Sequence, residues 1–327
     1  VERSRGLGDV YKRQDITTPD KDDKTIFYTA LYHTAISPNL FTDADGRYLG
    51  MDLEVHQGDT INPLYTVFSL WDTFRALHPL MTIIDPDLNN QFINSLIKKH
   101  QEGGIYPMWD LGSNYTGTMI GYHAVPVIVD AYMKGYRNFD AKEAYKASLR
   151  AAEYDTTGIV APDWLIPYVM PKARYYKNTL GYIPCDRENE SVAKALEYAY
   201  DDWCISVLAD SLGDTETKEK YARFADAYEF YFDPATRFMR GLDSKGEWRT
   251  PFSPIAYQGP GSVHGWGDIT EGFTMQYTWY VPHDVQGYIN LAGKKLFEKR
   301  LDDLFTVELP DDIPGAHDIQ GRIGGYW

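Results

Sequence analysis

Glu190–Gly213 reads ESVAKALEYAYDDWCISVLADSLG, and this stretch decides the fold class. Its apolar residues recur at the three- and four-residue spacing of one broad helical face: Val192, Ala195, Leu196, Ala199, Trp203, Ile205 and Leu208. Gly213 favours the left-handed backbone that commonly ends a helix. The spacing therefore predicts a helix over 190–212. Asp201 and Asp202 fall in its middle, and we expect one of them to lie on a solvated face.

The same helical period recurs on both sides of this helix. It predicts further helices at about 65–80, 86–103, 118–134, 141–154, 214–232, 271–288 and 294–305. We expect Pro79 to help end the first of them and Pro282 to bend the sixth. Phe41–Leu53 predicts a β-hairpin with Asp45-Gly46 as its turn. Because strands and helices do not alternate, we expect an all-α fold of helical hairpins stacked into an α/α toroid.

Composition narrows the function classes. The 327 residues carry 32 Lys plus Arg against 47 Asp plus Glu, a net charge of −15. This acidity disfavours nucleic-acid binding and anionic membranes, and no run of 18 apolar residues predicts a membrane span. The 26 Tyr and 8 Trp favour a carbohydrate-active enzyme, because flat aromatic rings stack on sugars. Cys185 and Cys204 are expected to be free, buried thiols.

Both ends of the sequence are unusual. Residues 1–14 (VERSRGLGDVYKRQ) are charged and unpatterned, and we interpret them as a non-native leader. The last residue is Trp327, with no polar tail after it. We therefore interpret 15–327 as a truncated chain.

Four residues of the first half are candidates for binding. Trp71 and Asp72 adjoin in SLWDT, and the alternative is a core Trp with an Asp72–Arg75 helix pair. Trp109 follows a glycine pair in a loop, where it is either a sugar platform or a loop anchor. His123 lies in an apolar stretch, where a core role is the more common one.

Glu271 is the candidate for catalysis. It follows a glycine-rich loop, 261–270, and Thr270 is predicted to cap a helix that has Glu271 in its first turn. A carboxyl group presented in this way can act as a general acid if apolar surroundings keep its proton on. The alternative is an ordinary N-terminal Glu, favoured by the helix dipole alone.

Read together, five blocks in order resemble glycoside hydrolase family 92, the calcium-dependent exo-acting α-mannosidases. The blocks are 27–33 (FYTALYH), 65–80 (YTVFSLWDTFRALHPL), 118–135 (TMIGYHAVPVIVDAYMKG), 196–204 (LEYAYDDWC) and 270–285 (TEGFTMQYTWYVPHDV). The resemblance implies an (α/α)6 toroid, incomplete here at its C-terminal end, and an N-terminal β-sandwich that this chain lacks. It also implies hydrolysis of terminal α-linked mannose with inversion, in the periplasm or outside the cell.

The resemblance also assigns roles to residues. It implies that Glu271 is the general acid, that Trp71 and Asp72 hold the terminal mannose, and that Trp109 and His123 lie near the same pocket. Two family blocks, HGNEPSHH and GxxGNDDxG, are absent, and with them the calcium ligands and the Asp base, which are expected beyond Trp327. Since inversion needs two carboxylates, we expect this chain to be inactive by itself.

The sequence departs from the family pattern in two places. Tyr115-Thr116-Gly117 stands where Glu-Thr is common, and Phe273-Thr274-Met275 stands where Asn-Ala-Trp is common. These changes bear on linkage preference. The alternatives to a mannosidase are a non-catalytic mannan-binding protein and another α/α-toroid enzyme, such as a glucosidase or a polysaccharide lyase. No pattern indicates the oligomeric state.

Overall fold

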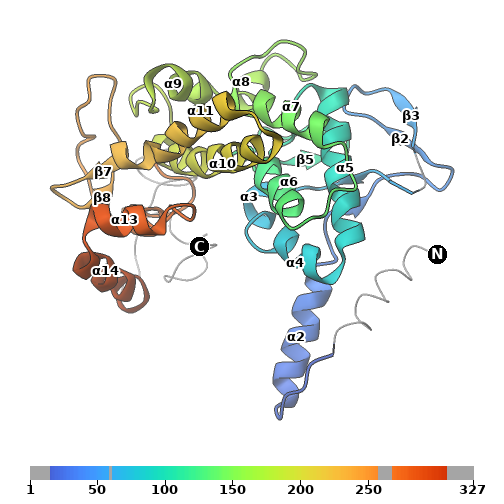
Figure 1. Cartoon of the computed structure of the whole chain (residues 1–327), viewed down its shortest axis with the longest axis horizontal. Coiled ribbons are helices and arrows are strands. Elements are labelled where there is room, and N and C mark those ends of the chain that lie inside the picture. Colours follow the sequence, from blue (N-terminus) through green and yellow to red (C-terminus); the bar gives the residue numbers. More distant parts are fainter. Residues whose placement is uncertain (1–14, 59–60, 257–266, 308–327) are drawn as a thin grey trace. The chain divides into compact units, whose positions relative to one another are not determined.

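Helices dominate the chain, which confirms the all-α class (Figure 1). The structure, a computed structural model, describes residues 15–58, 61–256 and 267–307. The chain divides into two compact units. The first unit is Val1–Thr118, His123–Ala151 and Thr156–Val169, and the second is Met119–Tyr122, Ala152–Asp155 and Met170–Trp327. None of the helices in the described ranges is long and apolar enough to cross a bilayer.

Three helices of the first unit contact one another: α4 (Leu77–Ile84), α5 (Pro86–Gly103) and α6 (Ala124–Met133). Its other helices are α2 (Lys21–His33), α3 (Leu70–Thr73), α7 (Ala141–Ala152) and α8 (Ile166–Val169).

Local sequence explains the bounds of α5. The Asp85 carboxylate accepts a hydrogen bond from the Leu88 N–H at 3.1 Å, Pro86 is the first helical residue, and Gly104 ends the helix with φ +87°.

Three two-stranded antiparallel sheets belong to the first unit. They pair β1 (Asn39–Leu40) with β4 (Tyr65–Thr66), β2 (Arg47–Leu49) with β3 (Val55–Gln57), and β5 (Asp110–Leu111) with β6 (Asn114–Tyr115). A hairpin is present at 47–57 rather than over Phe41–Leu53, and Asp45-Gly46 is not its turn. The strands turn between Gly50 and Glu54, whereas Asp43–Gly46 forms a separate turn before β2.

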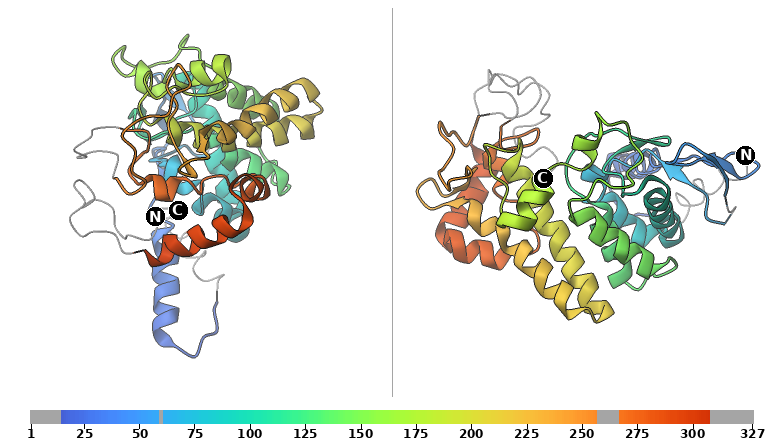
Figure 2. Two further views of the ribbon diagram at one scale, coloured as in Figure 1. Left: turned by 90° about the vertical axis from the view of Figure 1, so that its left-hand side faces the viewer. Right: turned by 90° about the horizontal axis from the view of Figure 1, so that it is seen from above.

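The second unit is built around α10 (Ser191–Leu212), which lies beside α11 (Thr215–Ala225) as a helical hairpin (Figures 1 and 2). Gly213 ends α10 with φ +80°, as predicted, and the Asp214 side chain caps α11. The remaining elements are α9 (Ala173–Leu180), the 3₁₀ helix η1 (Asp226–Tyr231), the β7–β8 pair (Phe232–Asp233 and Phe238–Met239), α12 (Thr274–Tyr277), α13 (Val285–Ala292) and α14 (Lys294–Thr306).

Three predicted helices are shorter than expected. Positive φ angles at Gly117, Met119 and Gly121 keep 117–121 out of the helical region, so that α6 begins at Ala124. The segment predicted as one helix over 65–80 is divided into α3 and α4. Pro79 does not end a helix, because it lies in the first turn of α4, where its missing N–H breaks no bond. The segment 271–288 is likewise divided, into α12 and α13.

The middle of α10 corrects one expectation about burial. Asp201 and Asp202 are both fully buried, whereas Trp203 is 38% exposed. Asp202 forms an ion pair with Lys177 at 2.8 Å and accepts a 2.6 Å hydrogen bond from the Tyr122 hydroxyl. Asp201 accepts a hydrogen bond from the Tyr122 N–H at 2.8 Å. Burial raises the pKa of Asp202 to about 6, although the ammonium group of Lys177 opposes this shift.

Candidate active site

The SLWDT turn of the first unit contains the first candidate pair. Trp71 is 1% exposed, and Arg75 places its guanidinium 5.3 Å from the centre of the Trp71 ring. Asp72 is partly exposed, and its carboxylate accepts a 2.5 Å hydrogen bond from the Ser69 hydroxyl. Of the two neighbours, Asp72 therefore presents a polar group to solvent, while the Trp71 ring is packed inside the unit.

Trp109 lies against this turn. It forms an antiparallel bridge with Ser69, and the neighbouring Met108 carbonyl accepts a hydrogen bond from the Leu70 N–H at 3.3 Å. The Trp109 side chain is partly exposed. Its carbonyl accepts both the N–H and the hydroxyl of Thr116, at 3.2 and 3.0 Å. The structure thus brings Trp109 and Asp72 together on one scaffold.

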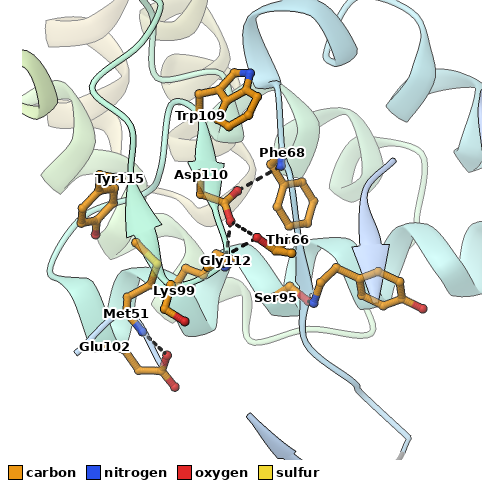
Figure 3. A network of polar contacts seen from close by, with 12 residues as sticks. Met51, Thr66, Phe68, Ser95, Lys99, Glu102, Trp109, Asp110, Gly112 and Tyr115 are labelled. Carbon is orange, nitrogen blue, oxygen red and sulfur yellow. Dashed lines mark hydrogen bonds and ion pairs between the residues drawn. The ribbon is translucent and has the colours of Figure 1, made fainter. Parts of the chain in front are cut away.

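Asp110 fixes the position of the Thr66–Phe68 segment next to the segment that contains Trp109 (Figure 3). The sequence alone did not indicate a role for Asp110. Its fully buried carboxylate accepts the Phe68 N–H at 3.0 Å and the Thr66 hydroxyl at 2.7 Å. Lys99 of α5, also fully buried, lies 2.9 Å from it and donates to the Gly112 carbonyl. A signal existed in the sequence: Lys99 falls on the apolar stripe of its helix, where a lysine needs a buried partner.

His123 packs in the core close to the same turn. It is 1% exposed, and its ring stacks on that of Phe74, with centroids 4.2 Å apart and planes 19° apart. His123 precedes α6 as its N-cap residue rather than lying inside a helix. The contact with Phe74 connects it to the segment that contains Asp72.

Glu271 belongs to the second unit and is partly exposed. It has φ +45°, a left-handed conformation that costs a non-glycine residue on the order of 1–3 kcal/mol. The prediction that Thr270 caps a helix starting at Glu271 was wrong, because α12 begins at Thr274. The Thr270 hydroxyl instead donates to the Glu190 carboxylate at 2.7 Å.

The start of α10 holds the segment that leads to Glu271. The N–H groups of Val192 and Ala193 both donate to the Asp268 carbonyl at 3.0 Å. The Glu190 N–H donates to the Gly267 carbonyl at 2.7 Å. The Ser191 hydroxyl donates to the Asp268 carboxylate at 2.9 Å. These bonds fix the backbone up to Thr270, so that Glu271 projects from an anchored segment.

A cavity of about 330 Å³ adjoins this segment in the second unit. Its lining includes Gly267, Asp268 and Thr274, which flank Glu271 in the sequence, together with Arg240 and Arg249, but not Glu271 itself. Arg249 forms an ion pair with Asp268 at 2.7 Å. Burial raises the pKa of Asp268 above its ordinary value, although this guanidinium opposes the shift. The cavity is large enough for a sugar ring and has polar groups to orient one.

The two cysteines are free and buried, as predicted. Burial raises the pKa of the Cys185 thiol to about 11, which leaves it protonated and unreactive at neutral pH.

A family model described as the catalytic domain of glycosyl hydrolase family 92 matches residues 9–327. The chain belongs to this family. Its helical hairpins are accordingly those of the (α/α)6 toroid, as the resemblance implied.

Solved members of the family from Bacteroides thetaiotaomicron are similar over nearly the whole chain. A family 92 α-mannosidase in complex with mannoimidazole is 50% identical, with a TM-score of 0.87 over 98% of this chain and 40% of that one. A family 92 inverting mannosidase is 32% identical, with a TM-score of 0.81 over 94% of this chain and 40% of that one.

An uncharacterized secreted glycosidase of Arthroderma benhamiae is 28% identical over 219 residues, which are 57% of this chain and 26% of that protein. The chain thus spans well under half the length of these relatives.

Proposed function

We propose that the protein containing this chain hydrolyses terminal α-linked mannose from glycans with inversion, and that Glu271 is the general acid. The observation that carries the proposal is the presentation of Glu271, a partly exposed carboxyl group in a left-handed conformation on a segment anchored by the start of α10. Strained backbone is commonly retained where function needs it. The similarity to an inverting mannosidase supports the stereochemistry.

Each candidate residue then has a role in binding or in catalysis. Asp72 accepts hydrogen bonds from sugar hydroxyls, and Trp109, which is bridged to Ser69 of the same turn, offers a partly exposed ring. Glu271 donates its proton to the glycosidic oxygen as the bond breaks. Trp71 and His123 support these groups from within the core. The base that activates water is expected beyond Trp327, and we propose that the chain by itself is inactive.

Calcium belongs to this proposal through the family resemblance. In the described part of the chain, one group of three side chains has metal-ligand spacing: Asp52, His56 and Glu102. It does not fit calcium, which takes six to eight oxygen ligands, because one of its three donors is an imidazole nitrogen. We therefore keep the calcium ligands beyond Trp327 and assign calcium no step in this chain.

The location of the protein is also a proposal. We place it in the periplasm or outside the cell, where mannose-containing glycans are encountered. The secreted glycosidase of Arthroderma benhamiae supports this placement.

The test uses Glu271→Gln in the full-length protein, with Glu188→Gln as the matched control at a partly buried carboxylate near the start of α10. We expect kcat on an α-linked mannobiose to fall 10²–10⁴-fold, roughly what a general acid contributes. A dinitrophenyl α-mannoside, whose leaving group needs no proton, should lose far less. Equal losses on both substrates would contradict the role of acid, and binding without hydrolysis by the wild type would favour the mannan-binding alternative.

A further inference from the structure

Asp52, His56 and Glu102 form a cluster with a different character from the candidate active site. Asp52 and His56 lie on the β2–β3 hairpin and Glu102 on the last turn of α5, all in the first unit. One donor atom from each lies within 4.8 Å of the other two. His56 Nε2 is 2.9 Å from both oxygens of Asp52. An imidazole and two carboxylates from separate segments therefore converge on one point.

The spacing suits a small divalent ion. Donor atoms that share one tetrahedral ion at about 2.0–2.2 Å lie about 3.3–3.6 Å from one another. The His56–Asp52 separation of 2.9 Å lies below this range and no separation exceeds 4.8 Å, so shifts of about an ångström would bring the three donors to one ion. The side chains of His56 and Asp52 are 31% and 30% exposed, which leaves room for water at the fourth position, whereas that of Glu102 is 4% exposed.

Gly50 is the second observation, independent of the three side chains. A Cβ atom at this buried position would lie 2.6 Å from an Asp52 oxygen, 2.7 Å from a ring carbon of His56 and 2.8 Å from a Glu102 oxygen. Its φ angle does not fall in the left-handed region, so backbone conformation does not demand a glycine here. The glycine instead leaves open the space that all three side chains face.

Neighbouring groups orient the donors in advance. The Tyr48 hydroxyl donates to one Glu102 oxygen at 2.6 Å and the Met51 N–H to the other at 3.2 Å (Figure 3 shows the second bond). The Tyr48 ring also stacks on His56, with centroids 5.5 Å apart. Such outer contacts hold metal ligands in place and tune their affinity. Lys98, half-exposed and 3.6 Å from Glu102, is the cation that an ion would displace.

We propose that Asp52, His56 and Glu102 bind a divalent transition-metal ion of the zinc class, which ties the β2–β3 hairpin to the end of α5. The donor set selects this class, because imidazole nitrogen with carboxylate oxygen suits zinc and its neighbours better than calcium. The site is structural, and it is independent of the mannosidase proposal.

The experiment measures Zn²⁺ binding to the chelator-treated, desalted protein by isothermal titration calorimetry, with Co²⁺ absorption as a spectroscopic check. We expect one equivalent to bind and to raise the unfolding midpoint by about 5 °C at saturation. His56→Ala should weaken this binding at least ~10–100-fold, the range that even outer-shell changes cause. His33→Ala, at an exposed histidine of the same unit, is the matched control and should leave binding unchanged.

Two further variants protect the test against misfolding. Asp52→Asn keeps the size and a hydrogen-bonding oxygen but removes the charge. Gly50→Ala leaves all three donor residues unsubstituted and places a methyl group in the space that they face. Both should lose Zn²⁺ binding while the circular dichroism spectrum is kept. No Zn²⁺ binding by the wild type, or equal binding by the wild type and His56→Ala, would overturn the proposal and leave His56 and Asp52 as a simple ion pair.

Discussion

The candidate residues of the two units are held in place by different means. In the first unit, Asp110 and Lys99 form a fully buried ion pair whose remaining bonds go to the segments that position Asp72 and Trp109. In the second unit, Glu271 keeps a left-handed backbone because hydrogen bonds from the start of α10 fix the residues before it. The binding candidates thus depend on a satisfied buried charge, and the candidate acid depends on local strain.

The two arrangements are expected to respond differently to mutation. A buried charge that loses its partner costs far more than the pair contributed, because desolvation is then uncompensated. A strained residue behaves in the opposite way, since relieving the strain adds stability while moving the functional group. Stability and activity should therefore change together in the first unit and in opposite directions at Glu271.

The largest expected effect follows removal of Lys99. Lys99→Met leaves the Asp110 carboxylate buried without its cation, and we expect the free energy of unfolding to fall by about 3–5 kcal/mol in urea denaturation. Because Asp110 holds the Thr66–Phe68 segment, the KM of the full-length protein for an α-mannoside should rise as well.

Lys177→Met is the matched variant, since it strips the buried Asp202 of its cation in the second unit. It should destabilise the protein by a similar amount without raising KM. If KM rises equally in both variants, Asp110 has no special part in positioning the binding residues.

Local signals explain which features could be predicted. The bounds of α5 and α10 follow from Asp85, Gly104 and Gly213, which act on the turns next to them. The break before α6 was missed because Met119 takes a positive φ, and nothing in its chemistry favours that conformation.

The candidate site was predictable in part, for a related reason. Asp72, Trp109 and Glu271 stand out by residue type and motif, so sequence reasoning selects them. Asp110 was missed, and Asp201 and Asp202 were misplaced, because burial of a charge is decided by partners far along the chain. Lys99 lies 11 positions before Asp110, and Lys177 lies 25 before Asp202. Helical periodicity can indicate that a residue such as Lys99 is buried, but it does not identify the partner of that residue.

A smaller expected effect concerns the pH dependence of stability and involves His78 of the first unit. Burial lowers the pKa of His78 to about 4, from about 6.5 in the unfolded chain, and its ring stacks on Phe68 beside the Asp110 network. The folded state therefore resists protonation of His78. Its contribution to stability is complete above pH 6.5 and is lost as the pH falls towards 4. At pH 4.5 the loss should reach about 2.5 kcal/mol relative to pH 7.

His78→Leu removes this titration. Between pH 7 and pH 4.5 the free energy of unfolding of this variant should fall by about 2.5 kcal/mol less than that of the wild type. His33→Leu, at an exposed histidine, should follow the wild type. Parallel curves for the wild type and His78→Leu would mean that His78 titrates normally in the folded protein.

The smallest expected effect concerns Glu271 and has the opposite sign. Glu271→Gly places at φ +45° the residue that adopts this conformation without strain, and we expect the free energy of unfolding to rise by about 0.5–1 kcal/mol. The same change removes the proposed acid, so the activity of the full-length protein on α-linked mannobiose should be lost. Glu219→Gly, at an exposed position inside α11, should instead lower stability by about 1 kcal/mol. A loss of stability in Glu271→Gly comparable to that of the control would show that the left-handed backbone is not strained, and that contacts of the Glu271 side chain stabilise the fold.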